Sequence, residues 1–126
     1  MGNDVFLNAI WNGKIEVVKS EVEKGADVNR IDHQTDGNPT ALILDFKAGR
    51  EEIAKYLISK GANVNGKDSN GNTPLFNLEM CKNKGTMAKL LIENGADVNI
   101  KNGFGNTAVK FCGSEVAAIL RDAGAS

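Results

Sequence analysis

Apolar residues recur at helical spacing in paired short blocks along the chain. The clearest pair occupies residues 41–46 and 53–58, and a second pair occupies residues 75–80 and 87–92. In the first pair the break falls at Gly49, and glycine commonly interrupts regular structure. Apolar positions that repeat every three to four residues on either side of such a break predict two helices joined by a tight turn.

A five-residue phrase, Gly-Ala-Asx-Val-Asn, follows each of the first three pairs. It occupies residues 25–29, 61–65 and 95–99, and a fourth copy begins at residues 124–125. Glycine readily takes a positive φ just past a helix, so each phrase predicts a helix end. The four glycines are spaced 36, 34 and 29 residues apart. A period in this range indicates stacked supersecondary units.

Each first helix is preceded by a glycine and a threonine. Thr40, Thr73 and Thr107 stand where a hydroxyl oxygen can accept a hydrogen bond from a free backbone N–H, which predicts an N-cap. Pro74 follows Thr73 and suits the first helical position, where a backbone donor is not needed. Residues 71–75 therefore give the cleanest predicted helix start.

Two stretches of the third unit carry a family resemblance. Residues 68–75 read Asp-Ser-Asn-Gly-Asn-Thr-Pro-Leu, and residues 90–99 read Leu-Leu-Ile-Glu-Asn-Gly-Ala-Asp-Val-Asn. Together they strongly resemble the ankyrin repeat, whose period of about 33 residues agrees with the spacing here. The resemblance covers nearly the whole chain.

This resemblance implies an all-α solenoid of four helix-turn-helix units with short β-hairpin or turn fingers. We expect a single domain over residues 1–126. Polar Ser20, Glu21 and Arg121 replace apolar residues in the end units, which are expected to act as caps of a complete protein. The units are expected at about residues 3–29, 30–65, 66–99 and 100–126.

The sequence also departs from the family pattern. Leu7, Ile43, Phe76 and Lys110 stand where the family usually has a histidine after Thr-Pro-Leu. The first finger carries three residues more than the others, within residues 30–36, and the last unit leaves room for a first helix of barely two turns. We therefore expect a less rigid array than an idealised one.

Composition narrows the classes of partner. Fifteen basic and sixteen acidic residues leave a formal charge of −1, which gives no long-range attraction to nucleic acid. No apolar run reaches the ~18 residues of a membrane span, and the first residues lack the pattern of a signal peptide. Cys81 and Cys112 make no metal-ligand spacing and are expected to be free thiols. We expect a cytoplasmic monomer, although an exported effector would look the same.

Catalytic chemistry finds little support. The single histidine, His33, lies in the polar first finger, far in sequence from either cysteine, and no phosphate-binding motif occurs. We expect no catalysis, no cofactor and no metal. The alternative left open is a small-ligand or peptide-modification binding ankyrin module or, rarely, an enzyme.

Two carboxylates, Asp45 and Glu79, stand at first-helix positions where the family usually has small buried alanines. A buried charge is costly unless it is paired. One interpretation is that helix rotation lets both reach solvent. The other is an acidic spot in the groove that receives a partner's Lys or Arg.

Function is expected in a groove that the resemblance implies along the first helices and fingers. Positions i and i+3 of a helix share one face, and aligning the units places a mixed stripe of large apolar and polar side chains there. Trp11 is expected either to anchor a protein partner or to pack within the cap. Phe111 is expected to lie either in the core or in the groove. Phe104 is expected either to cover the last helix pair or to contact a partner. The predicted partner-binding residues are Trp11, Asn8, Leu44, Lys47, Asn77, Met80, Phe104, His33 and Asp36.

Overall fold

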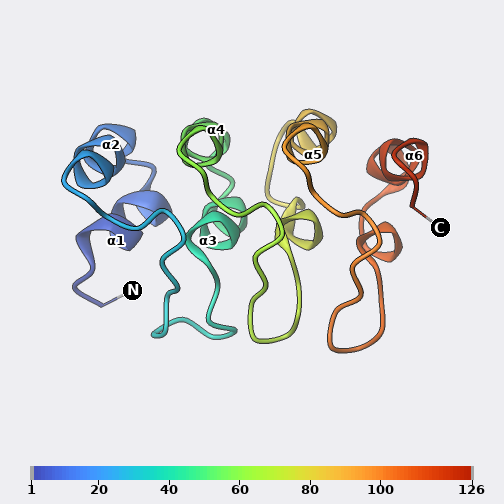
Figure 1. Cartoon of the computed structure of the whole chain (residues 1–126), viewed down its shortest axis with the longest axis horizontal. Helices are drawn as coiled ribbons and strands as arrows, with labels where there is room; N and C mark the ends of the chain where they lie inside the picture. The colour runs from blue at the N-terminus through green and yellow to red at the C-terminus, as the bar shows by residue number, and fades with distance from the viewer. Residues whose placement is uncertain (1, 126) are drawn as a thin grey trace.

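The computed structural model describes residues 2–125 and shows four helix pairs in a row (Figure 1). The inner layer holds the first element of each pair, the outer layer holds the second, and the loops between pairs project to one side as fingers (Figure 1). The elements are α1 (Val5–Asn12), α2 (Ile15–Glu23), α3 (Ala41–Ala48), α4 (Glu51–Ser59), η1 (Pro74–Asn77), α5 (Lys84–Glu93), η2 (Ala108–Lys110) and α6 (Ser114–Asp122). The predicted all-α solenoid is confirmed.

Side-chain caps start the first two inner helices. The Asp4 carboxylate accepts a hydrogen bond from the amide of Leu7 at 3.0 Å, and the Thr40 hydroxyl accepts one from the amide of Ile43 at 3.2 Å. Each bond satisfies a donor that has no partner within the helix. Gly49, with φ of 71°, ends α3 in the left-handed conformation. The predicted N-cap at Thr40 is confirmed.

The third and fourth units differ from the sequence expectation at their first helices. The hydroxyls of Thr73 and Thr107 make no capping bond, and a short 3-10 helix follows each of them. In the third unit the carbonyl of Thr73 accepts from the amide of Phe76 and from the side-chain amide of Asn77, both at 3.0 Å. An α-helix would need that carbonyl to accept from the backbone of Asn77 instead, so the 3-10 turn is favoured.

The expected two-turn helix of the last unit is also wrong, because η2 contains only three residues. The amide of Lys110 bonds the carbonyl of Thr107 at 3.2 Å, which is a 3-10 pattern. The chain then reaches Gly113, where α6 begins to form. The short connection leaves no length for a second turn.

The core runs along the contact between the two layers. The helix α3 packs against α1 on one side, against η1 on the other and against α4 in the outer layer. Residues 41–46 are consequently all buried, and Phe46, Leu57, Met87 and Leu120 are fully buried along the array. Burial of each such side chain stabilises the fold by about 1.5–3 kcal/mol.

The asparagine that ends each repeated phrase connects one unit to the next. The side-chain oxygen of Asn29 accepts from the amide of Asn63 at 2.7 Å. Asn65 repeats this contact one unit later with the amide of Asp97 at 2.8 Å. The phrase therefore joins units as well as ending helices.

The second and third fingers each contain a turn with the same hydrogen-bond pattern. The Asp68 carboxylate accepts hydrogen bonds from the amides of Asn70 and Asn72, at 2.9 and 3.0 Å, and the side-chain oxygen of Asn102 accepts two amides in the same way. The fingers are also bonded to each other, because the amide of Gly103 donates to the carbonyl of Asn70 at 2.8 Å.

The first finger is closed at its base by an isolated antiparallel bridge between Ile31 and Thr40. The carbonyl of Gly37 near its tip accepts a hydrogen bond from the amide of Ser69 in the next finger at 2.8 Å. Within residues 2–125 no strand longer than this single bridge forms, so these fingers are turns rather than extended hairpins.

Candidate partner-binding face

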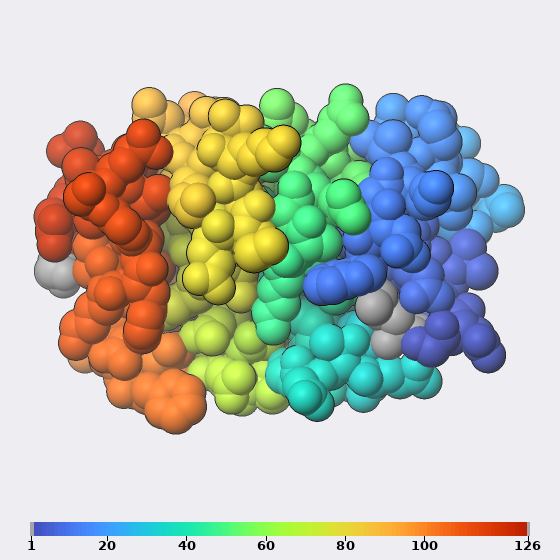
Figure 2. All heavy atoms as spheres, turned by 180° about the vertical axis from the view of Figure 1, so that it is seen from behind, coloured from blue at the N-terminus to red at the C-terminus, as the bar shows by residue number. Residues whose placement is uncertain are grey.

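Two adjoining hollows lie along the inner elements, one beside the fingers of the third and fourth units and the other between the second and third units. Figure 2 shows the molecule from behind, with the finger loops along its lower edge and the fourth unit, in orange to red, beside the third, in yellow-green to yellow. We call the first the aromatic hollow; it has a volume of about 340 Å³ and is lined by Asn72, Phe76, Glu79, Asn102, Phe104 and Phe111. We call the second the methionine hollow; it has a volume of about 350 Å³ and is lined by Lys47, Asn77, Glu79 and Met80.

The structure brings four of the predicted partner-binding residues to these hollows. Met80 is 63% exposed and Phe104 is 76% exposed, whereas Lys47 and Asn77 are half-buried. Phe111 is 59% exposed and lines the aromatic hollow, so of its two alternatives the core position is excluded. Large exposed apolar side chains grouped on a protein surface commonly mark an interaction site.

The expected place of Leu44 on this face is wrong, because its side chain is fully buried. When the units are aligned, Leu44 occupies the same repeat position as Asn8 and Asn77, both of which are half-buried. The difference comes from α3, which is covered on three sides by its neighbours. Asn8 lies at the other end of the array, where its side chain donates to the carbonyl of Gly2 at 2.9 Å.

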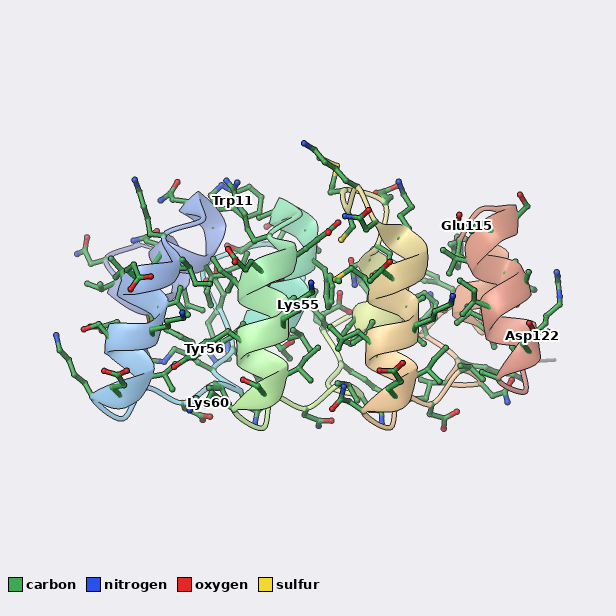
Figure 3. All side chains as sticks on the ribbon, turned by 90° about the horizontal axis from the view of Figure 1, so that it is seen from above. Trp11, Lys55, Tyr56, Lys60, Glu115 and Asp122 are labelled. Atoms are coloured by element: carbon green, nitrogen blue, oxygen red, sulfur yellow. The ribbon has the colours of Figure 1, made fainter. Side chains whose placement is uncertain are left out.

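Trp11 lies at the end of α1, on the side of the neighbouring unit (Figure 3), and is 39% exposed. Its carbonyl oxygen accepts two hydrogen bonds from the Arg50 guanidinium, at 3.1 and 3.0 Å from Nε and Nη2. This contact joins the first two units and was not predicted. His33 and Asp36 are exposed in the first finger, away from the two hollows.

The carboxylates of Glu79 and Asp45 differ in their exposure to solvent. Glu79 is exposed and lines both hollows, as the solvent interpretation requires. Asp45 is fully buried, and within residues 2–125 neither of its carboxylate oxygens has a hydrogen-bond partner. Burial raises the pKa of Asp45 well above its usual value, and the charge of Arg50 offsets this only in part. The expectation that Asp45 reaches solvent is therefore wrong.

A second unpredicted contact joins the outer layer. The Glu51 carboxylate accepts from the backbone amide of Asn83 at 2.7 Å and from its side-chain amide at 2.8 Å. Burial alone would raise the pKa of Glu51, but these hydrogen bonds outweigh it and hold the pKa below its usual value. No sequence motif marks this pair, because its members are 32 residues apart.

Neither cysteine has the environment of a nucleophile. Cys81 is buried, and burial, together with the negative charges of Glu51 and Asp45, raises the pKa of its thiol to about 11. Cys112 is half-buried, and burial also raises its pKa. Reactive cysteines need a lowered pKa and access to solvent. Both thiols are free rather than disulfide-bonded.

The outer face is charged and solvated. Lys55, Glu115 and Asp122 are exposed there (Figure 3). Tyr56 is half-buried among these charges, with the Lys19 and Lys60 ammonium groups 5.8 and 5.7 Å from the centre of its ring.

Within the described part of the chain, no three His, Cys, Asp or Glu side chains come together in a group able to hold a metal ion. Among the described helices, none has the length and apolar character needed to cross a membrane.

The sequence matches the family model for ankyrin repeats (3 copies) over residues 6–102. It is 40% identical to myotrophin of Xenopus tropicalis over 63 residues, which are 50% of this chain and 51% of that protein. It is 32% identical to human M-phase phosphoprotein 8 over 73 residues, 58% of this chain and 8% of that protein.

A further relative is an enzyme by name. The phosphocholine transferase AnkX of Legionella pneumophila is 31% identical over 75 residues, which are 60% of this chain and 8% of that protein. These matches span about half or less of each relative's length. The similarity therefore concerns the repeats and not the whole of those proteins.

Proposed function

The chain belongs to the ankyrin-repeat family, and from this premise we propose that it holds a protein partner against the face formed by its inner elements and fingers. Ankyrin repeats generally mediate protein–protein interaction. The roles that fit are those of an inhibitor, an adaptor, an effector or an immunity protein. No chemistry of its own is required.

One observation carries this proposal, namely the exposure of Met80, Phe104 and Phe111 around two adjoining hollows. Exposed aromatic and methionine side chains are enriched at interfaces, and a few such residues supply most of the binding free energy. Asparagine side chains around them add polar contacts. This arrangement of an apolar centre and a polar rim is typical of a protein interface.

Trp11 extends the proposed surface towards the first unit. Its carbonyl is held by Arg50, and the side chain keeps 39% of its area exposed. Tryptophan is among the residues most enriched at binding hot spots. His33 and Asp36 are exposed in the first finger and would contact a partner that extends along the fingers.

The alternative of a small-ligand site or an enzyme has weaker support. The transferase AnkX shares only a small part of its length with this chain. The raised pKa of Cys81 opposes a thiolate nucleophile, and His33 is exposed in a finger. We further propose a reducing, cytoplasmic setting, supported by the two free thiols, and a monomeric state.

A comparative pull-down from a lysate of the source organism tests the proposed function. The wild-type protein is compared with Met80→Glu on the proposed face and with Val17→Glu on the outer helix α2, where the apolar side chain is also exposed. We expect Met80→Glu to lose a specific partner that Val17→Glu retains, with the helical circular dichroism of both variants unchanged. Equal recovery by all three proteins would show that this face does not bind the partner.

A further inference from the structure

The aromatic hollow presents three phenylalanines and one carboxylate to the same space. The rings of Phe76 and Phe111 have centroids 6.0 Å apart and planes inclined by 47°. Phe104, at the tip of the last finger, lines the same hollow, and so does the exposed carboxylate of Glu79. The faces of three aromatic rings and a carboxylate in one hollow all attract positive charge.

The rim of this hollow is held in place before any partner arrives. The side-chain amide of Asn102 donates to the side-chain oxygen of Asn72 at 2.9 Å, which ties the third unit to the fourth. The side-chain oxygen of Asn102 in turn accepts from the amides of Phe104 and Asn106, at 2.9 and 3.1 Å. The finger that carries Phe104 is thereby fixed, and preorganisation of this kind lowers the entropic cost of binding.

The charge of Glu79 is not neutralised within residues 2–125. Its carboxylate makes no ion pair within 4.0 Å with the described lysines and arginines, although Lys47 lines the adjoining methionine hollow. Lys110, the nearest lysine in sequence to Phe111, bonds the side-chain oxygen of Asn106 at 3.2 Å and does not line the aromatic hollow. The hollow therefore offers an accessible negative charge.

From these observations we propose that the aromatic hollow receives a lysine or arginine side chain of the partner. The faces of aromatic rings attract cations that lie within about 6 Å of the ring centre. A carboxylate beside the rings adds an ion pair, and the long aliphatic stem of lysine or arginine covers apolar surface while its head stays polar. This assignment rests on the proposed protein-binding function and specifies which side chain the partner contributes.

A neutral apolar side chain fits this hollow less well. It would contact the phenylalanines but would desolvate the Glu79 carboxylate without compensation, which is unfavourable. An acidic side chain would meet a like charge. Only a cation satisfies both the rings and the carboxylate.

The test uses three defined probes in an NMR titration of the uniformly 15N-labelled protein. The probes are the N-acetyl methylamides of lysine, arginine and norleucine, the last being neutral and similar in length to lysine. We expect lysine or arginine to cause saturable shifts of the amide signals of Phe104 and Asn102, with norleucine at least about fivefold weaker. Equal binding of norleucine, or the absence of saturable shifts with either cation, would overturn the proposal.

Variants identify the groups responsible. Glu79→Gln and Phe104→Leu are each expected to weaken binding of the cationic probe about threefold. The matched control Glu115→Gln removes an exposed carboxylate from the outer face and should leave the affinity unchanged. Unchanged affinity in both Glu79→Gln and Phe104→Leu would contradict the site.

The same variants separate this proposal from the proposed function. If the pull-down partner is lost with Met80→Glu but kept with Glu79→Gln and Phe104→Leu, the protein-binding face stands and the cation site is wrong. If the partner is recovered equally with all of these variants, the assignment of the protein-binding face is wrong.

Discussion

The side-chain oxygen of Asn65 accepts a hydrogen bond of 2.8 Å from the backbone amide of Asp97, which belongs to the next unit. The side-chain amide of Asn65 also donates to the carbonyl of Gly95 at 3.0 Å. One asparagine thus satisfies a donor and an acceptor of its neighbour. In a linear array, where each unit contacts only its neighbours, such contacts between units contribute directly to stability.

We predict that Asn65→Ala lowers the free energy of unfolding by about 1–2 kcal/mol, because two hydrogen bonds between units are lost. The measurement is urea denaturation followed by circular dichroism. Lys67→Ala, at an exposed position nearby, serves as the control and should stay within about 0.5 kcal/mol of the wild type. Indistinguishable midpoints for the two variants would show that the Asn65 contacts do not stabilise the array.

Asp45→Ala is predicted to raise the free energy of unfolding at pH 7 by about 1–3 kcal/mol, because it removes a buried carboxyl group that has no described hydrogen-bond partner. Thermal denaturation measures the change. Glu79→Ala, which removes an exposed carboxylate, should alter stability by less than about 0.5 kcal/mol. A destabilised Asp45→Ala protein would mean that the carboxyl group makes a favourable contact.

The pH dependence of stability provides a separate prediction for Asp45. Its pKa in the folded protein is raised above the usual 3.8, so the folded state binds more protons than the unfolded state. The contribution of Asp45 to stability therefore falls as pH rises above about 3.8, until the raised pKa is passed. The difference in unfolding free energy between Asp45→Ala and the wild type should grow over that range of increasing pH. A difference independent of pH would refute the raised pKa.

Two finger glycines allow the cost of a steric contact to be measured. Gly71 and Gly105 have nearly the same positive φ, 79° and 78°, but a Cβ at Gly71 would lie 2.8 Å from the amide nitrogen of Gly103, whereas a Cβ at Gly105 would meet nothing within 4 Å. We predict that Gly105→Ala costs about 1 kcal/mol and Gly71→Ala at least about 1 kcal/mol more. Equal losses in urea denaturation would contradict the close approach of the fingers.

Thiol labelling tests the inert environment of the cysteines. With iodoacetamide at pH 8, we expect the folded protein to be labelled first at Cys112, which is half-buried, while Cys81 stays unmodified because it is buried and its pKa is about 11. Mass spectrometry after digestion reports each site. In urea both cysteines should react at similar rates. Rapid labelling of folded Cys81 would reopen the case for a reactive thiol.

The periodic features of the sequence predicted the repeated architecture because each has a local cause. The glycine of every phrase takes a positive φ after its helix, as at Gly61 and Gly95, and Thr40 caps α3 as its position suggested. The same local reasoning failed at Thr73, where the side chain of Asn77 competes for the carbonyl that an α-helix would use. Side-chain competition four residues away is not visible in a pattern of apolar positions.

The candidate site could be predicted only in part. Met80 and Phe104 are exposed beside the hollows, whereas Leu44 is buried by neighbouring elements, which a single-unit alignment does not represent. In the sequence Phe76 stands out as a replacement for the family's histidine, and nothing there indicates that its ring centroid lies 6.0 Å from that of Phe111 in the next unit. Contacts between units depend on the distance at which neighbouring units stack, and this distance cannot be inferred from the sequence of a single unit.

The hydrogen bonds between fingers have a consequence for how this surface changes over evolutionary time. Two of them, from the amide of Ser69 to the carbonyl of Gly37 and from the amide of Gly103 to the carbonyl of Asn70, use backbone atoms alone, whereas a third joins the side chains of Asn102 and Asn72. Apart from the close approach at Gly71 and the side chains of Asp68, Asn72 and Asn102, which form hydrogen bonds within or between the fingers, the side chains at the fingertips are then free to mutate while the spacing of the fingers is kept. New binding preferences can therefore arise by substitution at the tips without a compensating change in the scaffold.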